Sequence, residues 1–113
     1  DAVFAPDPVP PGYDAWIGTD LTIRRATLAA NVAQVNALRA ELVTMEPRYP
    51  TLALPVELVH GDADTVVPLT IHSLPLSKIL PNAALTVLPG TGHMPQHARP
   101  DAVIAAIARA ALR

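Results

Sequence analysis

The feature that most constrains the fold is a pair of short runs rich in β-branched and aliphatic residues, at positions 56–60 and 85–88. The first run lies between Pro55 and Gly61 and the second ends at Pro89 and Gly90, which is typical of strands. Residues 69–80 between them favour a helix, with Pro75 indicating a kink or a late start. A strand–helix–strand unit of this length makes the strands parallel, and parallel sheets need helices on both faces. Residues 55–113 therefore indicate the end of a larger, doubly wound α/β sheet.

Helices are expected around this unit. Residues 27–45 carry apolar side chains at spacings of three and four, typical of a helix that packs along one face. Thr27 is expected to cap this helix, and Pro47 and Pro50 to end it in a loop. A short helix is expected at 13–17 and a last one at 101–112, opening at Pro100 or Asp101. The apolar stripe of the long helix consists of Leu28, Val32, Val35, Leu38, Leu42 and Met45.

This pattern divides the chain into a helical part, residues 1–54, and a strand–helix–strand–helix part, residues 55–113. Half of the residues are hydrophobic and 16% are charged, which excludes a disordered chain. The net charge is −2 and the largest basic cluster is the pair Arg24 and Arg25, so neither nucleic acid nor a membrane surface is an expected partner. The chain has no cysteine, which excludes disulfides and thiolate metal sites. We expect a cytoplasmic protein.

Two loops follow the carboxyl ends of the expected strands, where ligands bind in open parallel sheets. Residues 61–68 offer the carboxylates of Asp62 and Asp64, and residues 89–97 offer His93 on a turn with Gly90 and Gly92. The glycines permit positive φ and leave space beside the ring. If the strands are neighbours, a carboxylate meets an imidazole at this edge. Such a carboxylate fixes the histidine tautomer and stabilises the imidazolium that forms when Nε2 takes a proton.

These loops resemble those of a known family. Gly-Asp-Ala-Asp-Thr-Val-Val-Pro after a strand, followed by Gly-Thr-Gly-His-Met-Pro before a last helix, is similar to the acid and histidine loops of α/β-hydrolases. The resemblance implies that Asp64 is the catalytic acid and His93 the catalytic histidine. It implies that residues 1–54 are the end of a helical lid, or cap, inserted before the acid strand. In this family the serine comes first in the chain, then the acid, then the histidine, and Asp64 before His93 agrees with that order.

The family's nucleophile motif, Gly-x-Ser-x-Gly, does not occur in the sequence. The two serines, Ser73 and Ser77, fall in or near the helix between the loops and lack the flanking glycines. Because the chain also lacks an initiating methionine, we interpret it as a cut, C-terminal piece whose nucleophile lies upstream. Alone it is expected to be inactive.

Other roles for the acidic residues are open. Asp62 and Asp64 could both be turn formers, because aspartate side chains bond to nearby N–H groups. Beside the histidine loop we favour the catalytic role for Asp64 and a structural turn role for Asp62. An Asp-x-Asp metal site is a further alternative, but the oxygen ligands of a calcium loop do not follow. No cofactor and no metal is expected.

The remaining histidines have simpler interpretations. His93 itself could be a surface histidine, although its place on a strand-exit loop favours function. His60, at a strand end, is expected to be packed or hydrogen-bonded, His97 to lie at a helix entry or on the surface, and His72 on the solvent side of a helix. A metal triad of His60, His93 and His97 lacks a tight ligand spacing.

Three hypotheses for the function are consistent with these residues. The first is part of a serine-type, esterase-like hydrolase acting on a small ester-like substrate; an aspartate nucleophile of the haloalkane type or cofactor-free haloperoxidase-like chemistry would use the same acid and histidine. The second is a non-catalytic assembly fragment, which pairs with the remaining N-terminal part of the hydrolase or with itself through open strand edges. The third is a hydrolase-like regulator without a nucleophile.

Overall fold

The computed structural model describes residues 2–112, except for the side chains of Thr19 and Thr22. Contacts within the chain divide it into two compact units. Unit 1 comprises Asp1–Val9 and Pro50–Arg113, and unit 2 comprises Pro10–Tyr49. The expected division between a helical cap, residues 1–54, and the strand–helix–strand–helix part, residues 55–113, stays a prediction.

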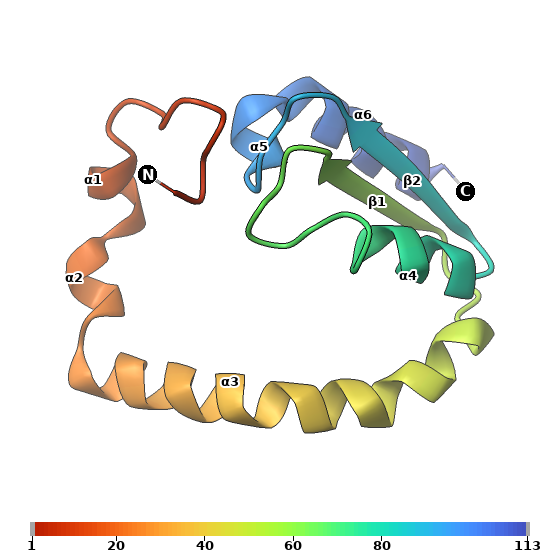
Figure 1. Cartoon of the computed structure of the whole chain (residues 1–113), viewed down its shortest axis with the longest axis horizontal. Helices are drawn as coiled ribbons and strands as arrows, with labels where there is room; N and C mark the ends of the chain where they lie inside the picture. The colour runs from red at the N-terminus through yellow and green to blue at the C-terminus, as the bar shows by residue number, and fades with distance from the viewer. Residues whose placement is uncertain (1, 113) are drawn as a thin grey trace. The chain divides into compact units, whose positions relative to one another are not determined.

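Unit 2 is helical, with α1 (Tyr13–Ile17), α2 (Thr19–Thr22) and α3 (Arg25–Met45), as Figure 1 shows. The short helix at 13–17 is confirmed, and α2 was not predicted. The N-cap expected at Thr27 is wrong. Arg24 has an extended backbone and its carbonyl already accepts the N–H of Leu28 at 2.9 Å, so Thr27 lies inside the first turn of α3.

The apolar stripe of α3 is exposed. Neither α1 nor α3 contains a buried residue. The six stripe side chains are between 44% (Leu42) and 69% (Val35) exposed. The expectation that this stripe is a packing face is therefore not met by contacts among the described residues. A period of three and four residues shows that one face of a helix is apolar, but not which surface covers it.

Proline ends α3 as expected, but the segment after it is not an irregular loop. It forms a 3₁₀ helix, η1 (Glu46–Thr51), which contains both Pro47 and Pro50. Proline is tolerated in the first turn of a helix because N–H groups there have no intrahelical partner. Pro47 lies in this first turn, and the helical segment continues through Pro50.

Unit 1 contains a two-stranded sheet, β1 (Val56–Gly61) and β2 (Ala83–Leu88), within the described residues. The strands are parallel, as predicted, and the register runs from Val56 opposite Ala83 to Gly61 opposite Leu88. The crossover helix α4 (Ser73–Ile79) begins later than residue 69. Its late start fits Pro75, which lies in the first turn, where it breaks no helical hydrogen bond.

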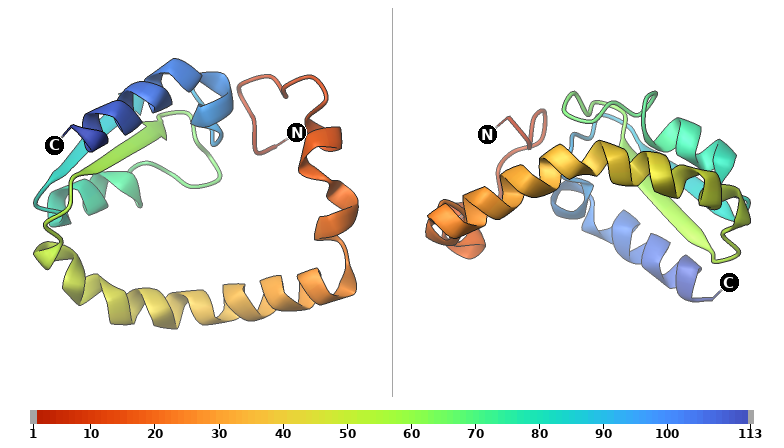
Figure 2. Two further views of the ribbon diagram at one scale, coloured as in Figure 1. Left: turned by 180° about the vertical axis from the view of Figure 1, so that it is seen from behind. Right: turned by 90° about the horizontal axis from the view of Figure 1, so that it is seen from below.

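Helices cover both faces of this sheet. Figure 2 shows α4 on one side and α6 (Pro100–Ala111) on the other, with α6 packed on β1 and α4 mainly on β2. Pro100 opens α6, as expected, and a short helix that was not predicted, α5 (Pro95–Ala98), precedes it. The buried apolar side chains are Phe4, Leu80 and Ala106. None of the helices within residues 2–112 has the length and hydropathy needed to cross a bilayer.

Candidate active site

The two loops at the carboxyl ends of β1 and β2 are joined by hydrogen bonds. We call residues 62–68 the acid loop and residues 89–94 the histidine loop. The Asp62 N–H donates to the carbonyl of Leu88, and the Ala63 N–H donates to the carbonyl of Thr91, both at 3.1 Å. In the reverse direction, the Gly90 N–H donates to Oδ1 of Asp62 at 2.6 Å. The structural role predicted for Asp62 is thus a bond across the two loops.

Glycine is required where these loops approach each other. A Cβ on Gly61 would collide with the carbonyl of Thr91, and one on Gly92 would collide with the carbonyl of Ala5. Gly90 has the positive φ expected of it, 65°. Gly92 does not: it is needed because backbone from residues 4 and 5 lies against it. Backbone contact at Gly61 therefore sets how closely the histidine loop approaches the end of β1, and backbone contact at Gly92 sets how closely residues 4 and 5 approach the histidine loop.

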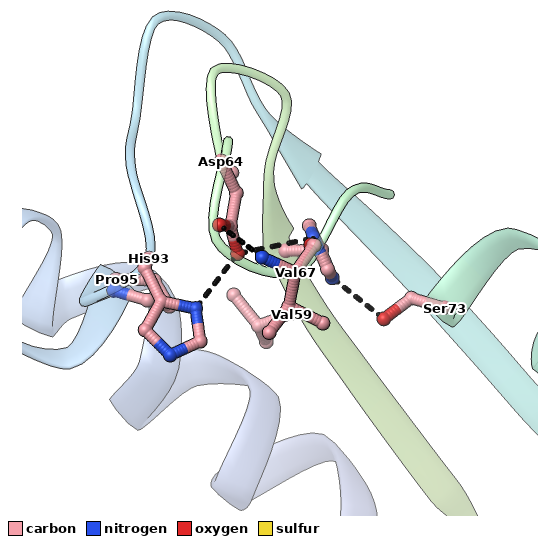
Figure 3. Close-up of a pocket in the computed structure, with 8 residues that line it drawn as sticks. Val59, Asp64, Val67, Ser73, His93 and Pro95 are labelled. Atoms are coloured by element: carbon pink, nitrogen blue, oxygen red, sulfur yellow. Dashed lines mark hydrogen bonds and ion pairs between the residues drawn. The ribbon is translucent and has the colours of Figure 1, made fainter. Parts of the chain in front are cut away.

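Asp64 and His93 lie in direct contact. Nδ1 of His93 is 2.9 Å from Oδ2 of Asp64. Because an ionised carboxylate only accepts, Nδ1 carries the hydrogen and Nε2 keeps its lone pair. Figure 3 shows Nε2 pointing away from Asp64, and no hydrogen bond to Nε2 occurs among residues 2–112. The side chain of Asp64 is 4% exposed and that of His93 is 33% exposed, so an oriented imidazole faces an accessible space.

The carboxyl group of Asp64 is held in its ionised form. Burial would raise its pKa, but hydrogen bonds from the N–H of Val67, from His93 and from the N–H of Val66, together with the positive charge that His93 carries when protonated, lower the pKa below its ordinary value. The two backbone bonds reach Oδ1 at 2.8 Å from Val67 and 2.9 Å from Val66. Oδ1 is thus occupied by the acid loop itself, which leaves Oδ2 to the imidazole.

A second histidine, His60, lies on the other side of Asp64. It is buried, as predicted from its position at a strand end, and both of its ring nitrogens are bonded. Nε2 lies 2.9 Å from the carbonyl of Val67 and 3.5 Å from Oδ2 of Asp64, while Nδ1 lies 2.7 Å from Oγ of Ser73. A carbonyl only accepts, so Nε2 carries the hydrogen, and in the tautomer with its one hydrogen on Nε2 the Nδ1 atom accepts the hydroxyl of Ser73. His60 thereby joins the end of β1, the acid loop and the start of α4.

These groups line an open pocket of about 230 Å³. Figure 3 shows Asp64, His93 and Ser73 around it, with Val59 and Val67 as apolar walls. The lining residues are Val59, His60, Gly61, Asp64, Val67, Ser73, His93 and Pro95.

The other residues considered from the sequence lie away from this pair. His97 is exposed on α5, where its ring lies 5.8 Å from that of Phe4 between centroids. His72 is exposed but precedes α4 instead of lying on it. Ser77 donates to the carbonyl of Leu74. Within residues 2–112, no three carboxylate, histidine or cysteine side chains are grouped to hold a metal ion.

Sequence reasoning missed two residues near the site. Ser73, the partner of His60, was considered only as a nucleophile. Asp7 was not considered, although its Oδ2 accepts the N–H of Gly92 at 2.7 Å. A polar residue at the end of a strand was a usable signal for His60 and its partner. Nothing in the sequence indicated a bond that spans 85 positions.

Among comparisons with known proteins, no family model matches the chain. It is 35% identical over 72 residues to uncharacterized proteins of Mycobacterium tuberculosis and Mycobacterium bovis, in matches that cover 63% of this chain and 21% of the relative. The chain therefore spans about a fifth of the length of these curated relatives.

Solved structures match over nearly the whole chain. A 2-hydroxy-6-oxo-6-phenylhexa-2,4-dienoate hydrolase from a Rhodococcus strain matches with a TM-score of 0.75 at 24% identity, over 99% of this chain and 41% of that one. A bacterial membrane phospholipase A matches with 0.67 at 24% identity, over 97% and 36%. A proposed non-heme bromoperoxidase from Mycobacterium tuberculosis matches with 0.51 at 25% identity, over 90% and 45%.

These neighbours have the α/β-hydrolase fold. The expected fold class is confirmed: the chain is a mixed α/β protein whose parallel strands and flanking helices match those of α/β-hydrolases.

Proposed function

We propose that this chain supplies the catalytic acid, Asp64, and the catalytic base, His93, of a serine-type α/β-hydrolase with esterase-like chemistry. One observation carries the proposal. Nδ1 of His93 is bonded to a buried carboxylate at 2.9 Å, while Nε2 faces an open pocket without a partner among the described residues. This is the arrangement a general base needs in acyl transfer.

The chemistry follows from the two ring nitrogens. Nε2 of His93 takes the proton of the serine hydroxyl as the serine oxygen attacks the ester carbonyl. Asp64, kept ionised by its hydrogen bonds, stabilises the imidazolium. The imidazolium then gives its proton to the departing alcohol as the carbon–oxygen bond of the ester breaks. A water molecule, deprotonated by Nε2 in the same way, then attacks the acyl group left on the serine. This step releases the carboxylic acid product and restores the serine.

The nucleophile is proposed to come from outside this chain. Ser73 is engaged with Nδ1 of His60 and Ser77 with a helix carbonyl, so neither faces His93. The pocket of about 230 Å³ is smaller than the roughly 300–1,000 Å³ of most small-molecule sites. The chain also spans only 41% of the first hydrolase structure it matches. All three observations support a site that further protein completes.

The proposal is tested by measuring ester hydrolysis. The assay uses a polypeptide in which this chain is joined to a core that carries the nucleophile. With p-nitrophenyl butyrate as substrate, His93→Ala should lower kcat by about 10⁴-fold or more, since triad members act as a unit. His72→Ala, which removes an exposed imidazole, is the matched control and should leave kcat unchanged. The 113-residue chain alone should show no turnover. Unchanged activity in His93→Ala would exclude the proposed base.

A second candidate is an assembly fragment without catalysis, favoured by the exposed stripe on α3 and by the open edges of the two-stranded sheet. Such a chain should self-associate or bind the remainder of a hydrolase. Size-exclusion chromatography with light scattering separates the two: a soluble monomer over a wide concentration range contradicts self-association.

A further inference from the structure

The segment at the start of the chain lies against the histidine loop within unit 1. We call residues 4–7 the N-terminal strap. Phe4 is 3% exposed, and its ring is tilted by 55° to that of His97 with the centroids 5.8 Å apart. The carbonyl of Ala5 occupies the place where a Cβ on Gly92 would lie. The strap and the histidine loop therefore touch at backbone atoms, with no side chain between them.

Asp7 connects the strap to this loop by a charged hydrogen bond. Its Oδ2 accepts the N–H of Gly92 at 2.7 Å, and its Oδ1 lies 3.6 Å from Nη1 of Arg99. The side chain of Asp7 is only 10% exposed, so water competes weakly for Gly92. Hydrogen bonds to a carboxylate are shorter and stronger than neutral ones, and the bond is of that kind.

Two carboxylates thus hold the histidine loop on either side of Thr91. Asp62 binds the N–H of Gly90, and Asp7 binds the N–H of the residue immediately before His93. The His93 side chain is one-third exposed, and its one hydrogen bond among the described residues is to Asp64. Its distance to Asp64 therefore depends on where the backbone at residue 92 is fixed.

We propose that Asp7 is a positioning residue, which fixes the backbone at Gly92 so that Nδ1 of His93 reaches Oδ2 of Asp64. This rests on the proposed function, in which the pair is the acid and base. The partners of Asp7 are the N–H of Gly92 and the guanidinium of Arg99, and not the imidazole of His93 or the carboxylate of Asp64. It acts by excluding loop positions in which the imidazole turns away from the carboxylate.

Proton NMR of the 113-residue chain tests the positioning separately from catalysis. The wild type should show a slowly exchanging downfield signal from the Nδ1–H of His93. Asp7→Ala should lose this signal and speed exchange of the Gly92 amide at least tenfold. Asp7→Asn keeps an oxygen acceptor and should restore the signal. Arg99→Ala, which removes the ion pair and keeps the bond to Gly92, should retain it.

Kinetics of the nucleophile-containing polypeptide supply the second readout. A misplaced base should lower kcat by about 10- to 100-fold with little change in KM, because ångström-scale displacement of a catalytic group is enough for such a loss. A persisting Nδ1–H signal in Asp7→Ala would overturn the proposal. If that variant does not fold, Asp7→Asn decides. It should keep the Nδ1–H signal but exchange the Gly92 amide faster than the wild type, because a neutral amide oxygen accepts more weakly than a carboxylate. An unchanged Gly92 exchange rate in Asp7→Asn would overturn the proposal. Absent ester hydrolysis in the wild type would refute the proposed function and leave the NMR outcome to judge Asp7.

Discussion

Unit 2 and unit 1 are held in shape by different kinds of contact. The helices α1 and α3 of unit 2 contain no buried residue, so tertiary burial contributes little to them. Around the candidate site of unit 1, hydrogen bonds join residues 28, 29 and 85 positions apart. The difference teaches that the helices of unit 2 have little tertiary support, whereas the candidate site of unit 1 depends on long-range contacts.

Burial shows the same contrast. The stripe on α3 leaves six apolar side chains exposed, whereas the buried residues of unit 1 include the polar His60, Asp64 and Thr91. Buried polar groups are unfavourable unless they are hydrogen-bonded. Among the described residues, no buried side-chain nitrogen or oxygen lacks a partner. Substitutions should therefore have large effects in unit 1 and small ones in unit 2.

The largest effect is expected from Asp64→Asn in the nucleophile-containing polypeptide. The amide can donate a hydrogen bond to Nδ1 of His93 and so favours the wrong tautomer, which should lower kcat by about 10⁴-fold. Steady-state ester hydrolysis measures this. Asp62→Asn keeps an acceptor for Gly90 and is the matched control. A loss of similar size in both variants would mean that loop structure, and not the acid, had been tested.

Gly61→Ala should come next, through stability. Its methyl group would overlap the carbonyl of Thr91, and overpacking of this kind costs about 1–3 kcal/mol. Urea unfolding monitored by circular dichroism gives the free energy of unfolding. Gly90→Asn is the control, because Gly90 has open space around its Cβ position and asparagine tolerates positive φ. Equal losses in the two variants would contradict the close approach of the loops.

Acid should weaken unit 1 through Asp64. The pKa of Asp64 is lowered in the folded chain, so the stability it contributes is fully present above the ordinary pKa of about 3.9. That contribution is lost as the pH falls through the folded pKa. The urea midpoint should therefore decrease below about pH 4 in the wild type and decrease less in Asp64→Asn. Asp101→Asn, on the exposed first turn of α6, should keep the wild-type acid response.

The smallest effect is expected in α3. Ala33→Gly should cost about 1 kcal/mol of helix stability, since glycine is a weaker helix former by that amount. Circular dichroism should show a modest loss of helix. The Nδ1–H signal of His93 should remain unchanged, because Ala33 belongs to unit 2. Loss of that signal would show that the two units are coupled in solution.

Much of the fold was predictable because it depends on the spacing of apolar residues and on the prolines and glycines that end each element. Runs of β-branched residues gave β1 and β2, and the crossover length gave their parallel order. The start of α3 was misplaced because a threonine before an apolar run suggested a cap, while Arg24 supplied the extended residue. The helices α2 and α5 have four residues each, too few for a period to be recognised.

The contact between Asp64 and His93 was predictable because parallel neighbours bring their following loops to one edge. The groups that support this pair were not. Asp7 binds a backbone N–H across 85 positions, and no local pattern marks such a partner. His60 was expected to be hydrogen-bonded, but only the three-dimensional arrangement identified Val67 and Ser73 as its partners.

The pairing of β1 with β2 also determines where related chains can differ in length. Side chains alternate between the faces of a strand, so one residue inserted in β1 would move His60 to the opposite face and shift Asp64 relative to His93. An insertion in residues 47–54 changes no strand register. Across an evolving lineage, gaps should therefore accumulate before Pro55 and be absent from the stretch between Val56 and Asp64.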